Sequence, residues 1–140
     1  MKIRIKKLHP DAVIPKYQTK GASGFDLHAL KYTLIPPGET RLIKTGLAFD
    51  VGPGYEMQIR GRSGLTLKTP LRIHLGTLDS DYFLECGIIA WNSSLNEFFE
   101  VFPKDRIAQG VISSVQQADI EEAEELYGED RGGGFGSTGV

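Results

Sequence analysis

The sequence lacks most of the features that mark secreted, membrane or metal-centred proteins. It holds one cysteine, Cys86, so no internal disulfide can form. No apolar run approaches the length of a membrane span, and the opening MKIRIKKLHP is too short and too polar for a secretory signal. Together these absences favour the cytoplasm. The three histidines, His9, His28 and His74, are scattered, so no metal-ligand spacing is visible.

An excess of charge of either sign is also missing. The chain has 16 lysines and arginines against 18 aspartates and glutamates, which gives a net charge of −2. Such a balance provides no general attraction to nucleic acid or to acidic membranes, and we expect neither as a partner. With 140 residues, 40% of them hydrophobic, the chain is expected to form one globular domain.

Long amphipathic helices are absent, and the pattern indicates short strands. Residues 2–8 (KIRIKKL) and 55–61 (YEMQIRG) alternate between two faces, as strands do. Residues 86–91 (CGIIAW) form a continuous apolar run, which predicts a strand buried on both faces. Only residues 63–68 (SGLTLK) suit one or two helical turns, and residues 118–128 remain ambiguous between helix and loop.

Turn-forming stretches rich in glycine, proline and asparagine separate these strands, as in IPPGET, DVGPGYE and NSSLNE. Many short strands joined by such turns predict an all-β fold, either a β-sandwich or a barrel-like jelly roll. Composition changes at Gly128. We therefore expect a β domain over residues 1–127 and a flexible glycine-rich tail over residues 128–140.

Within the tail, Arg131 and Phe135 interrupt the glycines of RGGGFGSTGV. Phe135 is suited to stack on a flat ring, and Arg131 to clamp a terminal phosphate. The backbone and hydroxyl groups of Gly136, Ser137 and Thr138 would add donors. Such a flap would order on binding and exclude water from the reaction. The alternative is a disordered terminus without function.

The stretch GRSGL places Arg62 and Ser63 between small residues, after a predicted strand and before the predicted helical turn. Exposed backbone N–H groups at Gly64, the hydroxyl of Ser63 and the guanidinium of Arg62 suit an anion, most plausibly phosphate. The alternative is a tight turn with an exposed arginine.

The stretch GTLDSDY contains two carboxylates, Asp79 and Asp81, which would share one face of a strand. A carboxylate beside a phosphate could orient or deprotonate water. Taken alone, a turn between strands is the favoured interpretation. The stretches GASGFDL, with Asp26, and KDRIAQG, with Gln109, are by themselves better explained as a strand end and a salt-bridged strand entry.

Read in order, GASGFDL, GRSGL, GTLDSDY, DRIAQG and RGGGFGSTG resemble the five motifs of the trimeric dUTPases, from about Lys2 to Thr138. The resemblance implies a jelly roll of the β-clip type and a homotrimer with three active sites at subunit boundaries. One chain would supply the first, second and fourth motifs, a neighbour the third, and the remaining chain its tail.

The resemblance also implies hydrolysis of dUTP to dUMP and pyrophosphate by attack of water at the α-phosphorus. This reaction keeps uracil out of DNA and supplies dUMP for dTMP synthesis. Mg²⁺ would be bound to the triphosphate without a direct protein ligand, and Asp26 would meet it through water. Asp79 resembles the base that activates the water and contacts the sugar 3′-hydroxyl. Tyr82 resembles the residue that packs on deoxyribose and leaves no room for a 2′-hydroxyl.

The remaining positions carried over by the motifs bind the phosphates and the base. Phosphate ligands would be Arg62, Ser63 and Gly64, supported by Gln109. The ring of Phe135 would cover uracil, and Arg131 would hold the γ-phosphate. A hairpin formed by the residues near Leu75–Leu78 and Glu85–Gly87 would read uracil with main-chain groups, and the substrate-binding residues expected within it are Gly76, Thr77, Leu78 and Gly87.

The third motif departs from the family pattern at four positions. Ile73 stands where asparagine is usual, Leu75 where proline is usual, and Phe83 and Leu84 where a basic or polar residue and a glycine are usual. The departures bear on uracil recognition and leave Asp79 untouched. They also keep open a nucleotide-binding or regulatory protein with weak turnover. A dCTP deaminase is a further alternative, although no water-activating glutamate lies beside GRSGL.

Overall fold

Antiparallel strands make up nearly all of the regular structure, which confirms the all-β prediction. The computed structural model describes residues 1–139, and residue 140, the last of the predicted tail, lies outside the described residues. One short helix, α1 (Ser63–Lys68), is the exception. The strands are β1 (Arg4–Lys7), β2 (Phe25–His28), β3 (Thr33–Ile35), β4 (Thr40–Lys44), β5 (Leu47–Asp50), β6 (Tyr55–Arg60), β7 (Leu71–Ile73), β8 (Gly76–Leu78), β9 (Gly87–Asn92), β10 (Phe99–Val101) and β11 (Arg106–Ser114).

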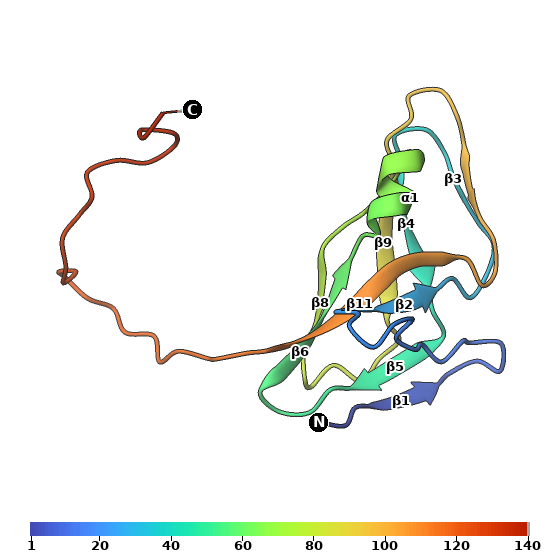
Figure 1. Cartoon of the computed structure of the whole chain (residues 1–140), viewed down its shortest axis with the longest axis horizontal. Helices are drawn as coiled ribbons and strands as arrows, with labels where there is room; N and C mark the ends of the chain where they lie inside the picture. Colours follow the sequence, from blue (N-terminus) through green and yellow to red (C-terminus); the bar gives the residue numbers. More distant parts are fainter. Residues whose placement is uncertain (140) are drawn as a thin grey trace.

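The strands form two main sheets and two ribbons (Figure 1). The larger sheet has the order β2-β11-β6-β8, and the smaller has the order β4-β9-β7. Strand β1 pairs with β5, and β10 pairs with β3. The long strand β11 lies between β2 and β6, and this arrangement brings three separate predicted motifs side by side.

The core lies between these sheets and is built from aliphatic side chains with a few aromatic ones. Phe25 and Phe49 stack with their ring centroids 6.2 Å apart. A Cβ at Gly110 would lie 2.6 Å from the Phe25 ring and 2.9 Å from the Met57 sulfur, so this close packing requires glycine in β11. The largest fully buried side chains include those of Leu27, Ile35, Ile43, Leu47, Met57, Leu71, Ile88 and Val101.

Strand β9 differs from its prediction. Ile88 and Ala90 are fully buried, but Ile89 and Trp91 are 45% and 46% exposed. The reason is that this chain covers only one face of the smaller sheet, so alternate residues of the apolar run point to solvent. On the neighbouring strand Leu42 pairs with Ile89 and is 58% exposed. Leu42, Ile89 and Trp91 together form what we call the outer apolar face.

Other sequence predictions were closer. Residues 4–7 and 55–60 are strands, and residues 63–68 form the expected helical turns. The ambiguous residues 118–128 form neither a helix nor a strand. Within residues 1–139, no helix has the length and apolar character needed to cross a membrane.

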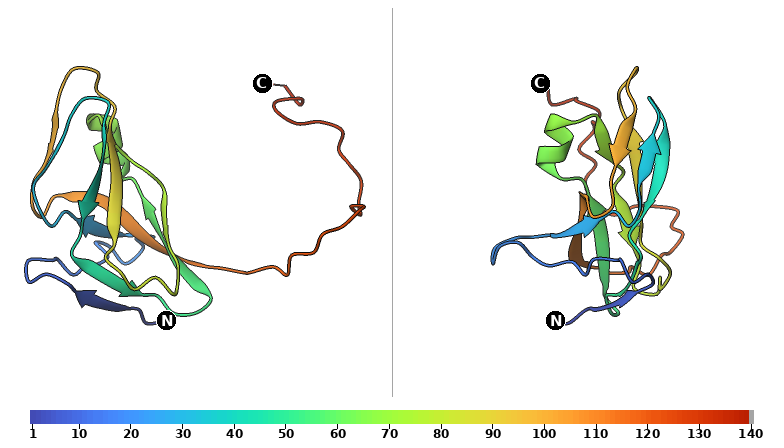
Figure 2. Two further views of the ribbon diagram at one scale, coloured as in Figure 1. Left: turned by 180° about the vertical axis from the view of Figure 1, so that it is seen from behind. Right: turned by 90° about the vertical axis from the view of Figure 1, so that its right-hand side faces the viewer.

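Beyond β11 the chain leaves the body. Val115 donates a backbone hydrogen bond to Gly54, and from there the chain runs outward as a long extended segment (Figures 1 and 2). Ile120, Tyr127 and Phe135 are essentially fully exposed. The tail residues contact one another rather than the sheets, as when Arg131 Nε donates to the carbonyl of Gly133 at 2.7 Å.

The single cysteine gives a testable pH dependence. Cys86 is fully buried, and burial raises the pKa of its thiol from 9.0 to about 12 despite a hydrogen bond with Thr45. Because the folded-state pKa is raised, this contribution to stability is complete below about pH 9 and is lost as the pH rises toward 12. At pH 10.5 the loss should be about 2 kcal/mol. Urea midpoints at pH 8, 9.5 and 10.5 should therefore fall more steeply for the wild type than for Cys86→Ala, and parallel curves would contradict the assignment.

Candidate active site

The GRSGL stretch holds an arginine against a buried carboxylate. Asp26, on β2, is only 8% exposed. Its Oδ1 lies 3.0 Å from Nε of Arg62, and its Oδ2 lies 3.4 Å from Nη1 of Arg106. Arg62 Nη1 also donates to the carbonyl of Arg106 at 2.8 Å. A buried carboxylate with two cationic partners fixes the Arg62 guanidinium in place, and its remaining N–H donors can meet an anion.

Gln109 joins this group from β11. Its Nε2 donates to the carbonyl of Gly61 at 2.9 Å, which ties β11 to the turn after β6. A Cβ at Gly24 would lie 2.7 Å from Oε1 of Gln109, so glycine is needed there for the glutamine to fit. The register places Gln109 opposite both Asp26 and Arg60. The structure thus brings three of the predicted stretches together within one chain.

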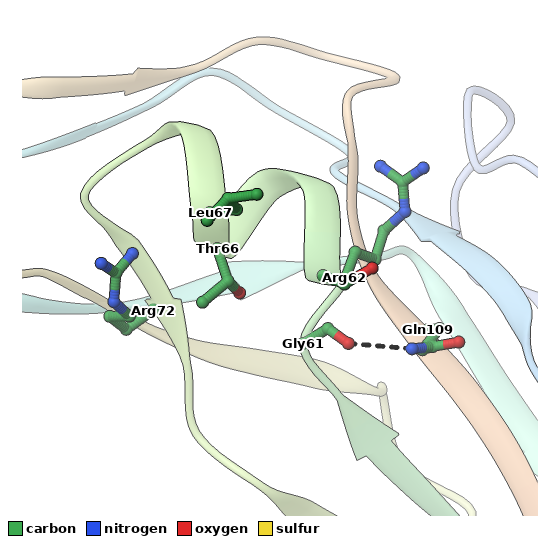
Figure 3. A pocket seen from close by; sticks show the side chains of 7 residues that line it. Gly61, Arg62, Thr66, Leu67, Arg72 and Gln109 are labelled. Atoms are coloured by element: carbon green, nitrogen blue, oxygen red, sulfur yellow. Dashed lines mark hydrogen bonds between the residues drawn. The ribbon is translucent and has the colours of Figure 1, made fainter.

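An open cavity of about 750 Å³ lies over this group (Figure 3). Arg62 precedes α1 in an extended conformation, and no side chain caps the first turn of the helix. Uncapped N–H groups, a serine hydroxyl and guanidinium groups together provide the donors that a phosphate needs. The cavity is lined by Gly61, Arg62, Ser63, Thr66, Leu67, Arg72 and Gln109.

Three of these lining residues, Thr66, Leu67 and Arg72, were not predicted as site residues. Figure 3 shows Arg72 and Arg62 on opposite sides of α1. Arg72 is held by its own neighbours, because its Nη1 donates to the carbonyls of Thr69 at 2.6 Å and Leu71 at 3.0 Å. A lone cation in the otherwise apolar strand LRI is the only sequence signal that points to it.

Asp79 lies immediately after β8, in a turn. The backbone N–H of Tyr82 donates to the carbonyl of Asp79 at 3.1 Å, so the turn weighed for this stretch is the structure it adopts. Asp79 and Asp81 nevertheless line one cavity of about 530 Å³. The two carboxylates thus share a side of the chain, as they would have done on one face of a strand. The rest of the lining comes from Ser80, from residues 53–56 and from Val115 and Gln117.

Between β8 and β9 the chain presents main-chain groups. The N–H of His74 donates to Ile89 at 2.9 Å, after which the chain leaves β9 and pairs with β6 as the edge strand β8. Within the described part of the chain, strand β8 is the edge of its sheet, so one side of Gly76–Leu78 is not paired with another strand. Unpaired backbone donors and acceptors at such an edge are suited to the rim of a flat heterocycle.

The four departures from the family pattern lie in different environments. Leu75, Phe83 and Leu84 are 63%, 60% and 70% exposed, so they alter the surface of the hairpin. Ile73 is half-buried and packs against the core, and a Cβ at Gly61 would lie 3.8 Å from its Cβ. Ile73 therefore supports the turn before α1 by apolar contact.

The Asp79 and Arg62 groups lie at opposite ends of β6. Leu78 pairs with Met57, so Asp79 continues toward the beginning of β6, while Arg62 follows its end. Met57 and Arg62 are five positions apart, which at the rise of a strand corresponds to about 17 Å. The segment beyond β11, which carries the tail residues, runs away from the body of the chain (Figure 2). Within residues 1–139 the predicted site residues therefore lie in separate groups.

Comparison with known proteins agrees with the motif order. The family model described as dUTPase matches residues 10–139. The chain belongs to the dUTPase family. It is 54% identical to the deoxyuridine 5′-triphosphate nucleotidohydrolase of Nautilia profundicola, with 99% of each chain covered. It is 48% identical to the same enzyme of Helicobacter pylori, with 100% of this chain and 98% of the relative covered.

Solved structures of other dUTPases share the fold. The Staphylococcus bacteriophage 80alpha dUTPase with dUpNHpp has a TM-score of 0.93 and 26% identity, with 99% of each chain covered. The dUTPase of phage phi11 of S. aureus, in a mutant form described with a structural Mg(II) ion, has a TM-score of 0.86 and 22% identity. That structure covers 90% of this chain and supports the fold alone.

The donor set can be tested against Mg²⁺, the metal implied by the family resemblance. Within residues 1–139 no three His, Cys, Asp or Glu side chains gather into a metal-binding group. Each oxygen of Asp26 is already next to an arginine, yet a carboxylate oxygen has a second lone pair that can accept from water. The residues present therefore fit a hydrated ion carried by a substrate.

Proposed function

We propose that this dUTPase-family chain hydrolyses dUTP to dUMP and pyrophosphate by attack of water at the α-phosphorus. The observation that carries the proposal is the Arg62 group: a guanidinium fixed by the buried Asp26, beside Gln109 and the uncapped beginning of α1. Membership of the dUTPase family supports its assignment as the phosphate-binding half of the site.

On the phosphate side, Arg62 and the N–H and hydroxyl groups of Ser63 and Gly64 bind phosphate oxygens. Gln109 supports them by holding Gly61. Charge accumulates on these oxygens in the transition state, and donors already in position stabilise it without reorganisation. Mg²⁺ arrives on the triphosphate as part of the substrate, where it neutralises phosphate charge. Asp26 meets it through water.

On the nucleoside side, Asp79 takes a proton from the attacking water and accepts a hydrogen bond from the sugar 3′-hydroxyl. Its cavity, shared with Asp81, is open enough for water. Main-chain groups of Gly76, Thr77, Leu78 and Gly87 read uracil, as the open edge of β8 allows. Tyr82 packs on deoxyribose. Ile73, where the family usually has asparagine, packs against the core beside Gly61, on the phosphate side of the site.

We further propose a homotrimer with shared sites. Support comes from the geometry of β6, because Asp79 follows the strand paired with the beginning of β6, whereas Arg62 follows its end, about 17 Å farther along by strand rise. A triphosphate site then needs the Asp79 of one chain and the Arg62 of another. The outer apolar face (Leu42, Ile89 and Trp91) is a surface that a neighbouring copy would cover.

Residues 128–140 form the flap of the remaining chain. Phe135 is fully exposed with a backbone φ of 51°, and the surrounding glycines allow a closing movement. When substrate is bound, Phe135 covers uracil and Arg131 holds the γ-phosphate. Gly136, Ser137 and Thr138 add donors, and the closed flap excludes bulk water. We place the enzyme in the cytoplasm, in keeping with its single free thiol.

Pyrophosphate release from dUTP, dTTP, dCTP and UTP tests the activity. We expect turnover of dUTP and strong discrimination against the other three. A protein that saturates with dUTP and releases no pyrophosphate would instead be a binding or regulatory member of the family.

Tyr82→Ala should relax discrimination against UTP. Without the ring there is no obstacle to a 2′-hydroxyl, while Asp79 and the phosphate ligands remain. We expect the UTP-to-dUTP ratio of kcat/KM to rise about tenfold or more. Tyr82→Phe is the comparison variant, because it keeps the ring and removes only the hydroxyl and its hydrogen bond to Glu85, and we expect it to raise the ratio less than Tyr82→Ala does. An unchanged ratio in Tyr82→Ala would remove the tyrosine from its role as sugar gate.

A further inference from the structure

The segment that carries Asp79 and Tyr82 is anchored to a distant turn by the Glu85 side chain. Oε1 of Glu85 accepts a hydrogen bond from the backbone N–H of Gly46 at 2.9 Å. Its Oε2 lies 3.6 Å from Nζ of Lys44. Glu85 is 39 positions from Gly46 in sequence, so this contact joins the β8–β9 segment to the turn between β4 and β5.

That turn is a firm support. Gly46 has a φ of +69°, and a Cβ there would lie 3.0 Å from Ala12 and 3.1 Å from Leu30, so the turn is closely packed. Two further bonds continue the attachment. Thr45 Oγ1 donates to the carbonyl of Cys86 at 2.7 Å, and the N–H of Cys86 donates to Leu47 at 2.7 Å.

From Glu85 the connection runs back to the reacting groups. The hydroxyl of Tyr82 donates to the carbonyl of Glu85 at 3.2 Å, and the N–H of Tyr82 donates to Asp79 at 3.1 Å. Phe83 and Leu84, which lie between Tyr82 and Glu85 in the chain, are largely exposed and contribute little packing to hold the segment in place. The position of the Tyr82 ring therefore depends on where Glu85 is held.

We propose that Glu85 is a positioning residue for substrate selection, and that its hydrogen bond to Gly46 holds the Tyr82 ring where it excludes a ribose. The proposal rests on the sugar-gate role of Tyr82 given above. Glu85 acts through Tyr82, because its carboxylate is engaged by the β4–β5 turn. Loss of the bond leaves the turn N–H without an acceptor and lets the chain between Asp79 and Glu85 shift, although the two bonds at Cys86 remain, and displacements of about 1 Å are enough to alter rates strongly.

Three substitutions at this position separate the hydrogen bond from the charge. Glu85→Gln keeps the acceptor for Gly46 and loses the pairing with Lys44. Glu85→Asp keeps the charge, but its side chain is one methylene shorter, so the carboxylate lies farther from the N–H of Gly46. Glu85→Ala removes both. We expect the UTP-to-dUTP ratio of kcat/KM to rise about tenfold in the Glu85→Ala variant and by a smaller factor in the Glu85→Asp variant. In the Glu85→Gln variant the ratio should stay within about twofold of wild type.

Ser94→Ala is the matched control. Ser94 Oγ accepts from the N–H of Glu97 at 3.0 Å in the turn after β9, so this change also deprives a turn of its side-chain acceptor. We expect an unchanged ratio, with melting temperatures recorded for every variant. If Glu85→Ala does not fold, the comparison of Asp with Gln decides.

The outcomes separate this inference from the role of Tyr82. A raised ratio in Ala and Asp with a normal ratio in Gln supports the inference. If Tyr82→Ala relaxes discrimination while the Glu85 variants match wild type, the positioning role of Glu85 is wrong and the sugar gate stands. If Glu85→Gln raises the ratio as much as Glu85→Ala does, the negative charge of Glu85 and not its hydrogen bond to Gly46 determines the ratio, and the inference as stated is wrong. If neither Tyr82→Ala nor any Glu85 variant moves the ratio, both roles fail.

Discussion

Asp79→Asn is expected to abolish turnover of dUTP while leaving nucleotide binding nearly intact. The amide keeps the shape of the carboxylate and can still bond the sugar, but it cannot take a proton from water. Loss of a general base typically lowers rates by about 10² to 10⁴. Pyrophosphate release measures kcat, and titration of the inactive variant with dUTP measures the dissociation constant.

Asp81→Asn is the matched control for this experiment. Asp81 lines the same cavity two residues away, so its substitution removes the same negative charge from the same surroundings. We expect it to lower kcat far less than Asp79→Asn. Retention of more than half of the wild-type kcat by Asp79→Asn would remove Asp79 from its role as base.

The second large effect concerns the tail and the assembly together. A variant truncated before Arg131 should be nearly inactive, because it lacks both the γ-phosphate clamp and the ring over uracil. Mixed with Asp79→Asn, however, it should regain activity. In a cyclic trimer of the two variants, one neighbour pairing joins an intact Asp79 to an intact tail, so each mixed trimer has one working site. Random assembly of equal amounts makes about three quarters of the trimers mixed, and we expect roughly a quarter of wild-type activity.

Co-refolding from denaturant allows the chains to exchange, and size-exclusion chromatography checks that trimers form. Each variant refolded alone provides the baseline. Activity of the mixture no higher than the mean of the two parents would mean that the tail serves the Asp79 of its own chain, or that no shared site exists.

Local patterns in the sequence predicted the strands and the helical turn, because these depend on the spacing of apolar residues and on turn chemistry. They also predicted GRSGL as an anion site, since small residues and a cation occur together there. Local patterns could not predict the pairing of Asp26 with Arg62 and Arg106. Those partners are far apart in the chain, and only the position of β11 between β2 and β6 brings them together.

Strand β9 shows a different limit. A continuous apolar run predicts a strand that is buried on both faces. The sequence does not say whether the residues that cover the second face belong to the same chain or to another one. In this chain Ile89 and Trp91 remain open to solvent. The hydrogen bond between Glu85 and Gly46 was likewise not predictable. The sequence around a glutamate that precedes a buried cysteine does not indicate whether its carboxylate binds a distant turn.

The length of β6 has a consequence for how the enzyme behaves on dilution. A single chain contains every reacting group, yet β6 separates the Asp79 group from the Arg62 group, so in the proposed homotrimer each complete site needs more than one chain. Specific activity then follows mass action among subunits and falls once the protein concentration drops below the dissociation constant of the assembly. Substrate that bridges two chains opposes this loss, because binding and association are linked through the same free energy.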